Sequence, residues 1–312
     1  MRRFRRILYL FDRPPEHDAA LDRAVDIARD AGATLTLAAL VETGDAAAVE
    51  ATRAALAKLA ERLRRGGGRA DQPTAGELAA IDCRVLTGEP DVAVVRAVLR
   101  DGYDLVMKKA GPDGGLVERL LGSLDTRLVE ICPCPVWIDR PIPHPRYSRI
   151  LAAVEVLAEE GAELHVTIVD LASSVAAFER AELFVVTAFE IEGETAMRGR
   201  AATQAARRSI DELVDRERRR HELALEALVA PFRDRPVSIH TRVLKGDPVR
   251  VVPEAARELE IDLVVLGTTI RSHLAGVLLG STATAIIRSV ACAVLVVKPP
   301  TFETPIRLED DR

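Results

Sequence analysis

Apolar residues fall into short continuous runs that alternate with longer segments, in which apolar residues recur every three or four positions. A run such as residues 7–11 is typical of a buried strand. Residues 16–31, with Leu21, Val25 and Ala28 on one face, predict an amphipathic helix. Strands that alternate with helices at this spacing require parallel crossovers, with helices covering both faces of a sheet. The pattern therefore predicts an α/β fold.

The same alternation continues through the first half of the chain. We expect Trp137, in the last strand of this half, to pack inside the protein rather than to recognise a ligand. The remaining strands are predicted at residues 34–41, 81–86, 105–108 and 136–138, and the remaining helices at residues 46–65, 91–100 and 116–131.

A strand–loop–helix segment occurs twice in the chain. Residues 104–107 and 262–265 both begin Asp-Leu-Val, and each stretch is followed at the same distance by a Gly-Ser pair. The prolines in residues 140–148 make a stiff, extended connection between the copies. The chain is therefore a duplication, with predicted domains at residues 1–140 and 149–300 and an acidic tail at residues 301–312.

Alignment of the two repeats decides one ambiguous segment. Residues 164–169 contain Val-Thr-Ile-Val, which favours a strand by propensity alone. The register with the first repeat instead places them in a helix, followed by a strand at residues 183–189 and a helix at about residues 201–229. The charged run in that second helix is interpreted as a solvated face.

The second copy of the duplicated segment could bind an anion. Gly280, Ser281 and Thr282 precede a predicted helix at residues 283–290. A helix N-terminus leaves backbone N–H groups unpaired, and a glycine lets a phosphate approach them. The alternative is a helix cap made by the serine hydroxyl. Arg271 and His273, in the preceding loop, would either donate to a phosphate or stay solvated.

Composition narrows the function classes. The 312 residues carry a net charge of −5, with both signs interspersed, which argues against nucleic acid or a membrane surface as partner. No apolar run reaches the ~18 residues of a membrane helix, and four cysteines make no disulfide framework, so we expect a cytoplasmic protein.

Cys132 and Cys134 could be a redox pair or metal ligands, but small buried side chains are the simpler interpretation. The histidines are scattered and form no catalytic or metal motif, so we do not expect an enzyme, although slow ATP hydrolysis stays open.

Each repeat places a Gly-Ser pair after its fourth strand, and the second repeat also ends that strand with a glycine. These features resemble the universal stress protein family. The ending V-K-P-P-T-F-E-T-P at residues 297–305 is similar to its tandem E-type branch. The resemblance implies two doubly wound, flavodoxin-like parallel sheets of five strands, in the order 3-2-1-4-5, with adenine nucleotide at the switch point. It also implies an intramolecular pseudo-dimer through the last strands, residues 136–138 and 294–297, and leaves a higher oligomer open.

The family's binding residues carry over to positions of this chain. Ile270 stands where the family has a glycine, and Glu155 where it has an aspartate. The implied nucleotide site of the second repeat is Ala153, Glu155, Ala188, Leu266, Gly267, Ile270, Gly280, Ser281 and Thr282. The degenerate equivalent in the first repeat is Asp12, Lys109, Pro112, Gly122 and Ser123.

Two functions follow from these residues. The first is a stress-response regulatory module that binds ATP, with Mg²⁺ at its phosphates, in the second repeat. The alternative is a module for a non-nucleotide ligand or a protein partner of unknown identity, with a degenerate nucleotide pocket. Ile270, Lys109 and Pro112 favour the alternative, whereas Gly280 and Ser281 favour the first.

Overall fold

The protein is described from a computed structural model, in which residues 4–11, 16–41, 45–66, 78, 80–111, 123–157, 161–268 and 280–308 can be described. The chain forms two compact units. The first unit contains Met1–Arg146, Thr268–Gly280 and Ala291–Arg312, and the second contains Tyr147–Gly267 and Ser281–Val290. The last strand of the second repeat therefore belongs to the first unit.

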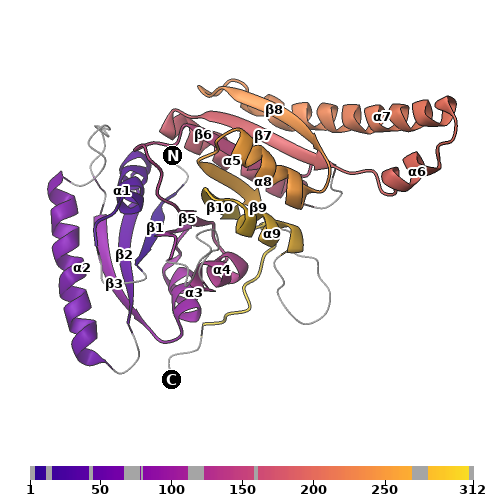
Figure 1. Cartoon of the computed structure of the whole chain (residues 1–312). Helices are drawn as coiled ribbons and strands as arrows, with labels where there is room; N and C mark the ends of the chain where they lie inside the picture. The colour runs from indigo at the N-terminus through magenta and orange to yellow at the C-terminus, as the bar shows by residue number, and fades with distance from the viewer. Residues whose placement is uncertain are drawn as a thin grey trace. The chain divides into compact units, whose positions relative to one another are not determined.

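Strands and helices alternate through the first repeat, as predicted (Figure 1). The structure describes the helix expected at residues 116–131 from Ser123 onward. The elements are β1 (Arg6–Phe11), α1 (Ala19–Ala31), β2 (Thr34–Val41), α2 (Ala46–Gly66), β3 (Ala80–Thr87), α3 (Pro90–Asp101), β4 (Leu105–Lys109), α4 (Ser123–Ile131) and β5 (Val136–Asp139).

The second repeat has the same order with one additional helix. Residues 164–169 are helical, which confirms the assignment made from the repeat register against strand propensity. The elements are β6 (Arg149–Ala153), α5 (Ala162–Glu179), β7 (Glu182–Phe189), α6 (Glu194–Arg200), α7 (Gln204–Val229), the 3-10 turn η1 (Ala230–Phe232), β8 (Ile239–Lys245), α8 (Pro248–Glu258), β9 (Leu263–Gly267), α9 (Ser281–Ser289) and β10 (Ala293–Val297).

Local chemistry sets the ends of the helices. Helix α1 begins three residues later than the pattern predicts, because the Asp18 carboxylate accepts a hydrogen bond from Leu21 N–H and caps it. Gly32 ends α1 at φ 64°, in the left-handed region that glycine adopts without strain. Helices α3 and α8 both begin with a proline, whose missing N–H has no partner in a first helical turn anyway.

The sheet of the first unit has the order β3-β2-β1-β4-β5-β10. Strands β1 to β5 are parallel and follow the predicted order 3-2-1-4-5. Strand β10 pairs with β5 antiparallel, with Leu295 opposite Trp137, so the expected pairing of the two last strands is confirmed. Trp137 is fully buried, in agreement with its predicted role in packing.

The second unit contains the parallel order β8-β7-β6-β9, which repeats the first four positions of the first sheet. One aspartate clamp occurs in both units. The Asp104 carboxylate accepts hydrogen bonds from the N–H groups of Arg5 and Arg6, at 2.7 and 3.1 Å, beside β1. Asp262 accepts from Ser148 and Arg149 N–H in the same way, at 2.6 and 3.2 Å, beside β6. Each aspartate thus aligns the first and fourth strands of its repeat.

Helix α6 was not predicted from the sequence, which gave one helix over residues 201–229. Helix α7 begins only after Thr203, whose hydroxyl accepts from Ala206 N–H, and it extends beyond β7 and β8 to where α6 lies beside it (Figure 1). Met197 and Ala201 pack against Phe189. Met197 lies in α6 but Ala201 follows it, so this seven-residue helix offers too few apolar positions for a helical stripe in the sequence.

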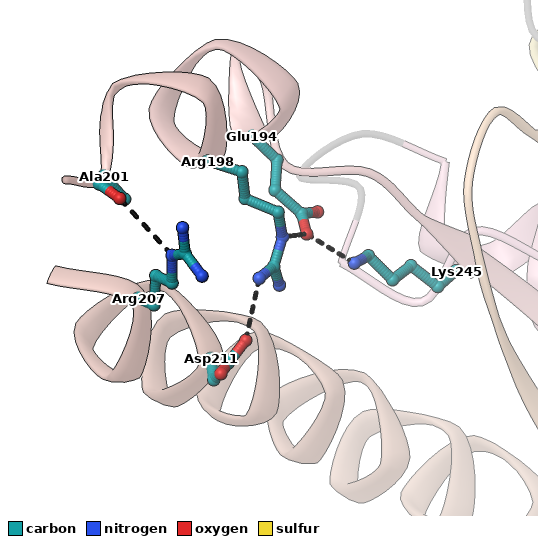
Figure 2. A network of polar contacts seen from close by, with 6 residues as sticks. All are labelled: Glu194, Arg198, Ala201, Arg207, Asp211 and Lys245. Carbon is teal, nitrogen blue, oxygen red and sulfur yellow. Dashed lines mark hydrogen bonds and ion pairs between the residues drawn. The ribbon is translucent and has the colours of Figure 1, made fainter. Parts of the chain in front are cut away.

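Ion pairs attach α6 to its neighbours (Figure 2). The Glu194 carboxylate accepts from Arg198 Nε at 2.7 Å and from Lys245 Nζ at 2.6 Å. Arg198 also donates to Asp211 on α7, at 2.9 Å. The hydrogen bond from Lys245 is the main reason that the pKa of Glu194 lies below its ordinary value. Exposed pairs of this kind are screened by solvent and contribute little to stability, so they orient α6 more than they stabilise the fold.

The first repeat buries two ion pairs. Lys108, in β4, pairs with Asp125 of α4, and both side chains are almost completely buried. Arg23 Nε lies 3.2 Å from an Asp139 carboxylate oxygen, and both side chains are 3% exposed. At the positions of Lys108 and Asp125 the second repeat has Leu266 and Ala283.

This difference between the repeats predicts how each would tolerate substitution. Asp125→Ala should lower the free energy of unfolding by about 3–5 kcal/mol, because it leaves the buried Lys108 ammonium without its carboxylate. The double variant Lys108→Leu/Asp125→Ala copies the Leu266 and Ala283 pair, and it should recover most of that loss. Urea unfolding curves of the three proteins test this. A double variant no more stable than Asp125→Ala would contradict it.

Candidate functional site

The predicted nucleotide residues of the second repeat lie largely at the carboxyl ends of its strands. Ala153 is the last residue of β6 and is aligned with Leu266 in β9 and Val186 in β7. Ala188 lies two residues further along β7. Strand β6 has its successor β7 on one side and β9 on the other, so these ends form the switch point at which open α/β sheets bind ligands. The structure therefore brings together Ala153 and Leu266 as the family resemblance implies.

Helix α9 begins at Ser281, directly after Gly280. Ser281 and Thr282 are exposed, and the first turn of the helix contains no acidic residue. Backbone N–H groups at such a helix start favour an anion, both as donors and through the helix dipole. Ile270, Arg271 and His273 lie outside the described residues, so their predicted contributions stay predictions.

Glu155 follows β6 and is exposed, so its carboxylate is free to reach a ligand hydroxyl. Its backbone N–H donates to His165 Nδ1 at 3.3 Å. His165 lies in the first turn of α5 and is 6% exposed. Its Nε2 atom has no hydrogen-bond partner in the part of the chain that the structure describes. Since Nδ1 accepts, the neutral ring carries its proton on Nε2.

Sequence reasoning missed His165 because it treated the six histidines as scattered. A usable signal existed: His165 directly follows Leu164, the first member of the buried stripe of α5, and so lies near the start of that helix. Burial is the main cause that lowers the pKa of His165, and the nearby Glu155 charge opposes the shift. A second buried polar group, the Thr187 hydroxyl beside Ala188, also has no partner among the described residues.

Gly267 has a packing role that its motif position does not reveal. A Cβ atom at Gly267 would lie 2.7 Å from Leu164 Cδ2 and 2.9 Å from Ile168 Cδ1, both on α5. Contacts this short force neighbouring side chains to move. The close approach of α5 to the end of β9 therefore favours glycine here, whether or not a phosphate binds.

The first repeat places a carboxylate in the corresponding region. Asp125, in the first turn of α4, accepts a hydrogen bond from Gly111 N–H at 3.1 Å while it pairs with Lys108. Lys109 ends β4 as an exposed side chain, and Ser123 begins α4. Asp12, Pro112 and Gly122 lie outside the described residues. The Asp125 carboxylate thus accepts a hydrogen bond from a loop N–H group, the kind of donor that a phosphate would use.

The first unit also contains a cavity of about 510 Å³ near the start of α1 and the ends of β4 and β5. The buried Arg23–Asp139 pair forms part of its wall, and Pro141, Ile142 and Pro145 of the connecting segment close one side. The other charged lining residues are Asp18, Asp22, Lys109 and Arg140.

In the described part of the chain, the His, Cys, Asp and Glu side chains form no group of three or more that could hold a metal ion. Within the same residues, no helix combines the length and the apolar character needed to cross a membrane.

The fold and the duplicated helix start define a tandem, doubly wound α/β protein with a candidate ligand site at the switch point. The universal stress protein family matches the chain twice, at residues 3–140 and 146–298. Universal stress protein E of Escherichia coli strain K12 is 30% identical over 228 residues, which cover 71% of this chain and 69% of that protein. The chain belongs to the universal stress protein family and is similar to its tandem-domain members.

A second relative and two solved structures are also similar to this chain. Universal stress protein E of Salmonella typhi is 31% identical over 229 residues, covering 71% of this chain and 69% of that protein. The crystal structure of a protein of unknown function from Pseudomonas aeruginosa PAO1 has a TM-score of 0.73 at 24% identity, and covers 96% of this chain and 94% of that one. A universal stress protein from Archaeoglobus fulgidus has a TM-score of 0.56 at 15% identity, with 94% and 98% covered. Both solved structures share the fold of this chain.

The packing of Gly267 makes a testable prediction. Gly267→Ala should lower the free energy of unfolding by about 1–3 kcal/mol, because the new methyl group meets Leu164 and Ile168. Gly199→Ala is the matched control, since a Cβ there meets nothing within 4 Å and lies in a helix. It should be neutral or stabilise by up to about 1 kcal/mol. Equal effects of the two substitutions on urea unfolding would refute the packing role.

Burial of His165 predicts a pH dependence. Its folded-state pKa lies below the ordinary value of 6.5, so between the two values the unfolded chain binds more protons. The free energy of unfolding should therefore fall as the pH drops below about 6.5. His165→Asn keeps an acceptor for Glu155 N–H but cannot titrate, and it should flatten that part of the curve. His240→Asn, at an exposed histidine, serves as control. Parallel curves for wild type and His165→Asn between pH 5 and 8 would exclude this role.

Proposed function

We propose that this universal stress protein is a regulatory module whose second repeat binds an adenine nucleotide, ATP with Mg²⁺ at its phosphates. Binding rather than turnover is its proposed role. The observation that carries the proposal is the contrast between the two helix starts. In the first repeat the Asp125 carboxylate already holds Gly111 N–H, whereas in the second repeat Ala283 takes the place of that carboxylate. The start of α9 therefore lacks the internal carboxylate that accepts from the loop in the first repeat, which supports an external anion there.

The residues around this helix start fit such a ligand. Ala153 and Ala188 are small and partly exposed, so they leave room for an apolar ring beside the strand ends. The exposed Glu155 carboxylate is suited to accept hydrogen bonds from ribose hydroxyls. Exposed backbone donors at Ser281 and Thr282 suit the phosphates. Each phosphate hydrogen bond of this charge-assisted kind is worth roughly 1.5–3 kcal/mol.

The cavity in the first unit supports a second candidate function, which is the binding of a non-nucleotide ligand by the first repeat. Its charged lining contains both signs, and the Asp125 carboxylate takes the loop donor. Because most of the exposed lining is apolar, a compact molecule with an apolar part and a charged group suits it better than a nucleoside triphosphate. The two functions are compatible, because they use different repeats.

Calorimetric titration with ATP and Mg²⁺ tests the first function. Wild type should bind one equivalent, and Gly280→Val should abolish binding, since a branched side chain blocks the approach of a phosphate to the helix start. Gly122→Val, at the aligned position of the first repeat, is the matched control and should leave the affinity unchanged.

Ile270→Gly restores the glycine of the family pattern and should tighten ATP binding by roughly ten- to a hundredfold, if isoleucine costs about 1–3 kcal/mol of strain. Failure of both wild type and Ile270→Gly to bind would reject the nucleotide function. Mass spectrometry of small molecules released from gently purified protein then distinguishes the candidates: a nucleotide supports the first function, and a non-nucleotide compound supports the second.

A further inference from the structure

Two cysteine thiols face each other inside the first unit. Cys132 follows α4 and Cys134 precedes β5, with a single proline between them. Their Sγ atoms are 3.5 Å apart. Cys132 is fully buried, and Cys134 is 8% exposed. Burial alone would agree with two small apolar side chains, but burial does not require the sulfur atoms to meet.

A buried ammonium group accompanies the thiols. Lys298 directly follows β10. Because β10 pairs antiparallel with β5, Lys298 lies near the residues that precede β5, which include Cys132. Its Nζ donates to the Glu130 carbonyl at 3.0 Å and lies 4.6 Å from the centre of the Phe302 ring. Burial lowers the pKa of Lys298 to about 8.

The surroundings differentiate the two thiols. The hydrogen bond between the two thiols is the largest cause of both pKa shifts. It lowers the pKa of Cys132 and raises the pKa of Cys134. The Lys298 charge adds to the lowering at Cys132. The thiolate is the reactive form of cysteine, and the Lys298 ammonium is held at the carbonyl of Glu130, two residues before Cys132, so Cys132 is the nucleophile of the pair and Cys134 its resolving partner.

We propose that Cys132 and Cys134 form a reversible disulfide when a small hydroperoxide, such as hydrogen peroxide, enters this site. The Cys132 thiolate attacks one peroxide oxygen and breaks the O–O bond, which gives Cys132 sulfenic acid and a hydroxide that takes a proton to become water. Cys134 sulfur then attacks the sulfenic sulfur, and its proton leaves with the hydroxyl group as a second water. Two thiols lose two electrons, and one peroxide gains them.

Geometry favours this product over further oxidation. A disulfide needs its sulfur atoms about 2.05 Å apart, so the two Sγ atoms have only a short distance to close. A resolving thiol at this distance captures the sulfenic acid before a second peroxide converts it to sulfinic acid. The burial of both thiols restricts the oxidant to a molecule as small as a hydroperoxide, and a dithiol reductant would reverse the bond once it gains access.

The test uses the full chain with Cys83→Ser and Cys292→Ser, so that only the pair remains. Protein treated with hydrogen peroxide is unfolded, alkylated and analysed by peptide mass spectrometry. We expect the peptide with both cysteines to lose two hydrogen atoms and to resist alkylation, at a rate roughly tenfold above the oxidation of Cys83 in wild type. Full alkylation of both thiols, or sulfinic acid without a bridge, would overturn the proposal.

Two variants separate this chemistry from mere proximity. Lys298→Met should slow disulfide formation by roughly tenfold, which corresponds to one pKa unit at Cys132, whereas Lys58→Met on the exposed face of α2 should not change the rate. Cys134→Ala should stop the reaction at Cys132 with the gain of one oxygen atom. Equal rates for wild type and Lys298→Met in folded protein, checked by circular dichroism, would contradict the assigned role of Lys298.

Discussion

The antiparallel pairing of β10 with β5 is the interaction on which the organisation of this chain depends. Val294, Leu295 and Val296 are at most 1% exposed and lie opposite Ile138, Trp137 and Val136. A short strand at a sheet edge exposes apolar side chains and unpaired backbone groups to water, and both are unfavourable. The pairing of β10 with β5 buries the side chains and gives the backbone groups hydrogen-bond partners. Because β10 is the last strand of the second repeat, separation of the repeats would expose β5. The residues after β10 also bond to the first repeat. Lys298 donates to the Glu130 carbonyl, and Arg96 Nε donates to the Arg307 carbonyl.

The duplication preserved the framework while the interiors of the repeats diverged. Asp104 and Asp262 make the same backbone clamp, whereas Lys108 and Asp125 have apolar counterparts in the second repeat. A buried ion pair has a desolvation cost that its Coulomb attraction only partly offsets, so the apolar pair is at least as stable. Stability therefore does not explain the charged interior of the first repeat. A local role does, because Asp125 occupies a loop donor and the charges near Arg23 line a cavity.

Much of the fold could be predicted from the sequence, because duplication supplies a register that propensity lacks. That register placed residues 164–169 in a helix although their composition favours a strand. Helix α6 escaped prediction because Met197, which packs at the Phe189 cluster, does not by itself form a helical stripe in a seven-residue segment. The strand-end site residues were predictable from the family pattern, but His165 and the facing thiols of Cys132 and Cys134 were not. The sequence marks the position of His165 near the start of α5 and the spacing of the two cysteines, but the burial of His165 and the 3.5 Å between the two Sγ atoms are visible only in the structure.

Gly267 shows how a motif glycine can be required for two different reasons. Its position suits the approach of a phosphate, yet the packing of Leu164 and Ile168 already excludes a side chain there. The corresponding residues of the first repeat are Leu21, Val25 and Lys109. Val25 is shorter than Ile168 by one methylene group, and Lys109 is exposed at the end of β4. A glycine at this position is therefore weak support for a nucleotide, because helix packing alone accounts for it. The stronger support comes from α9, whose start has exposed Ser281 and Thr282 and carries Ala283 where the first repeat has the Asp125 carboxylate.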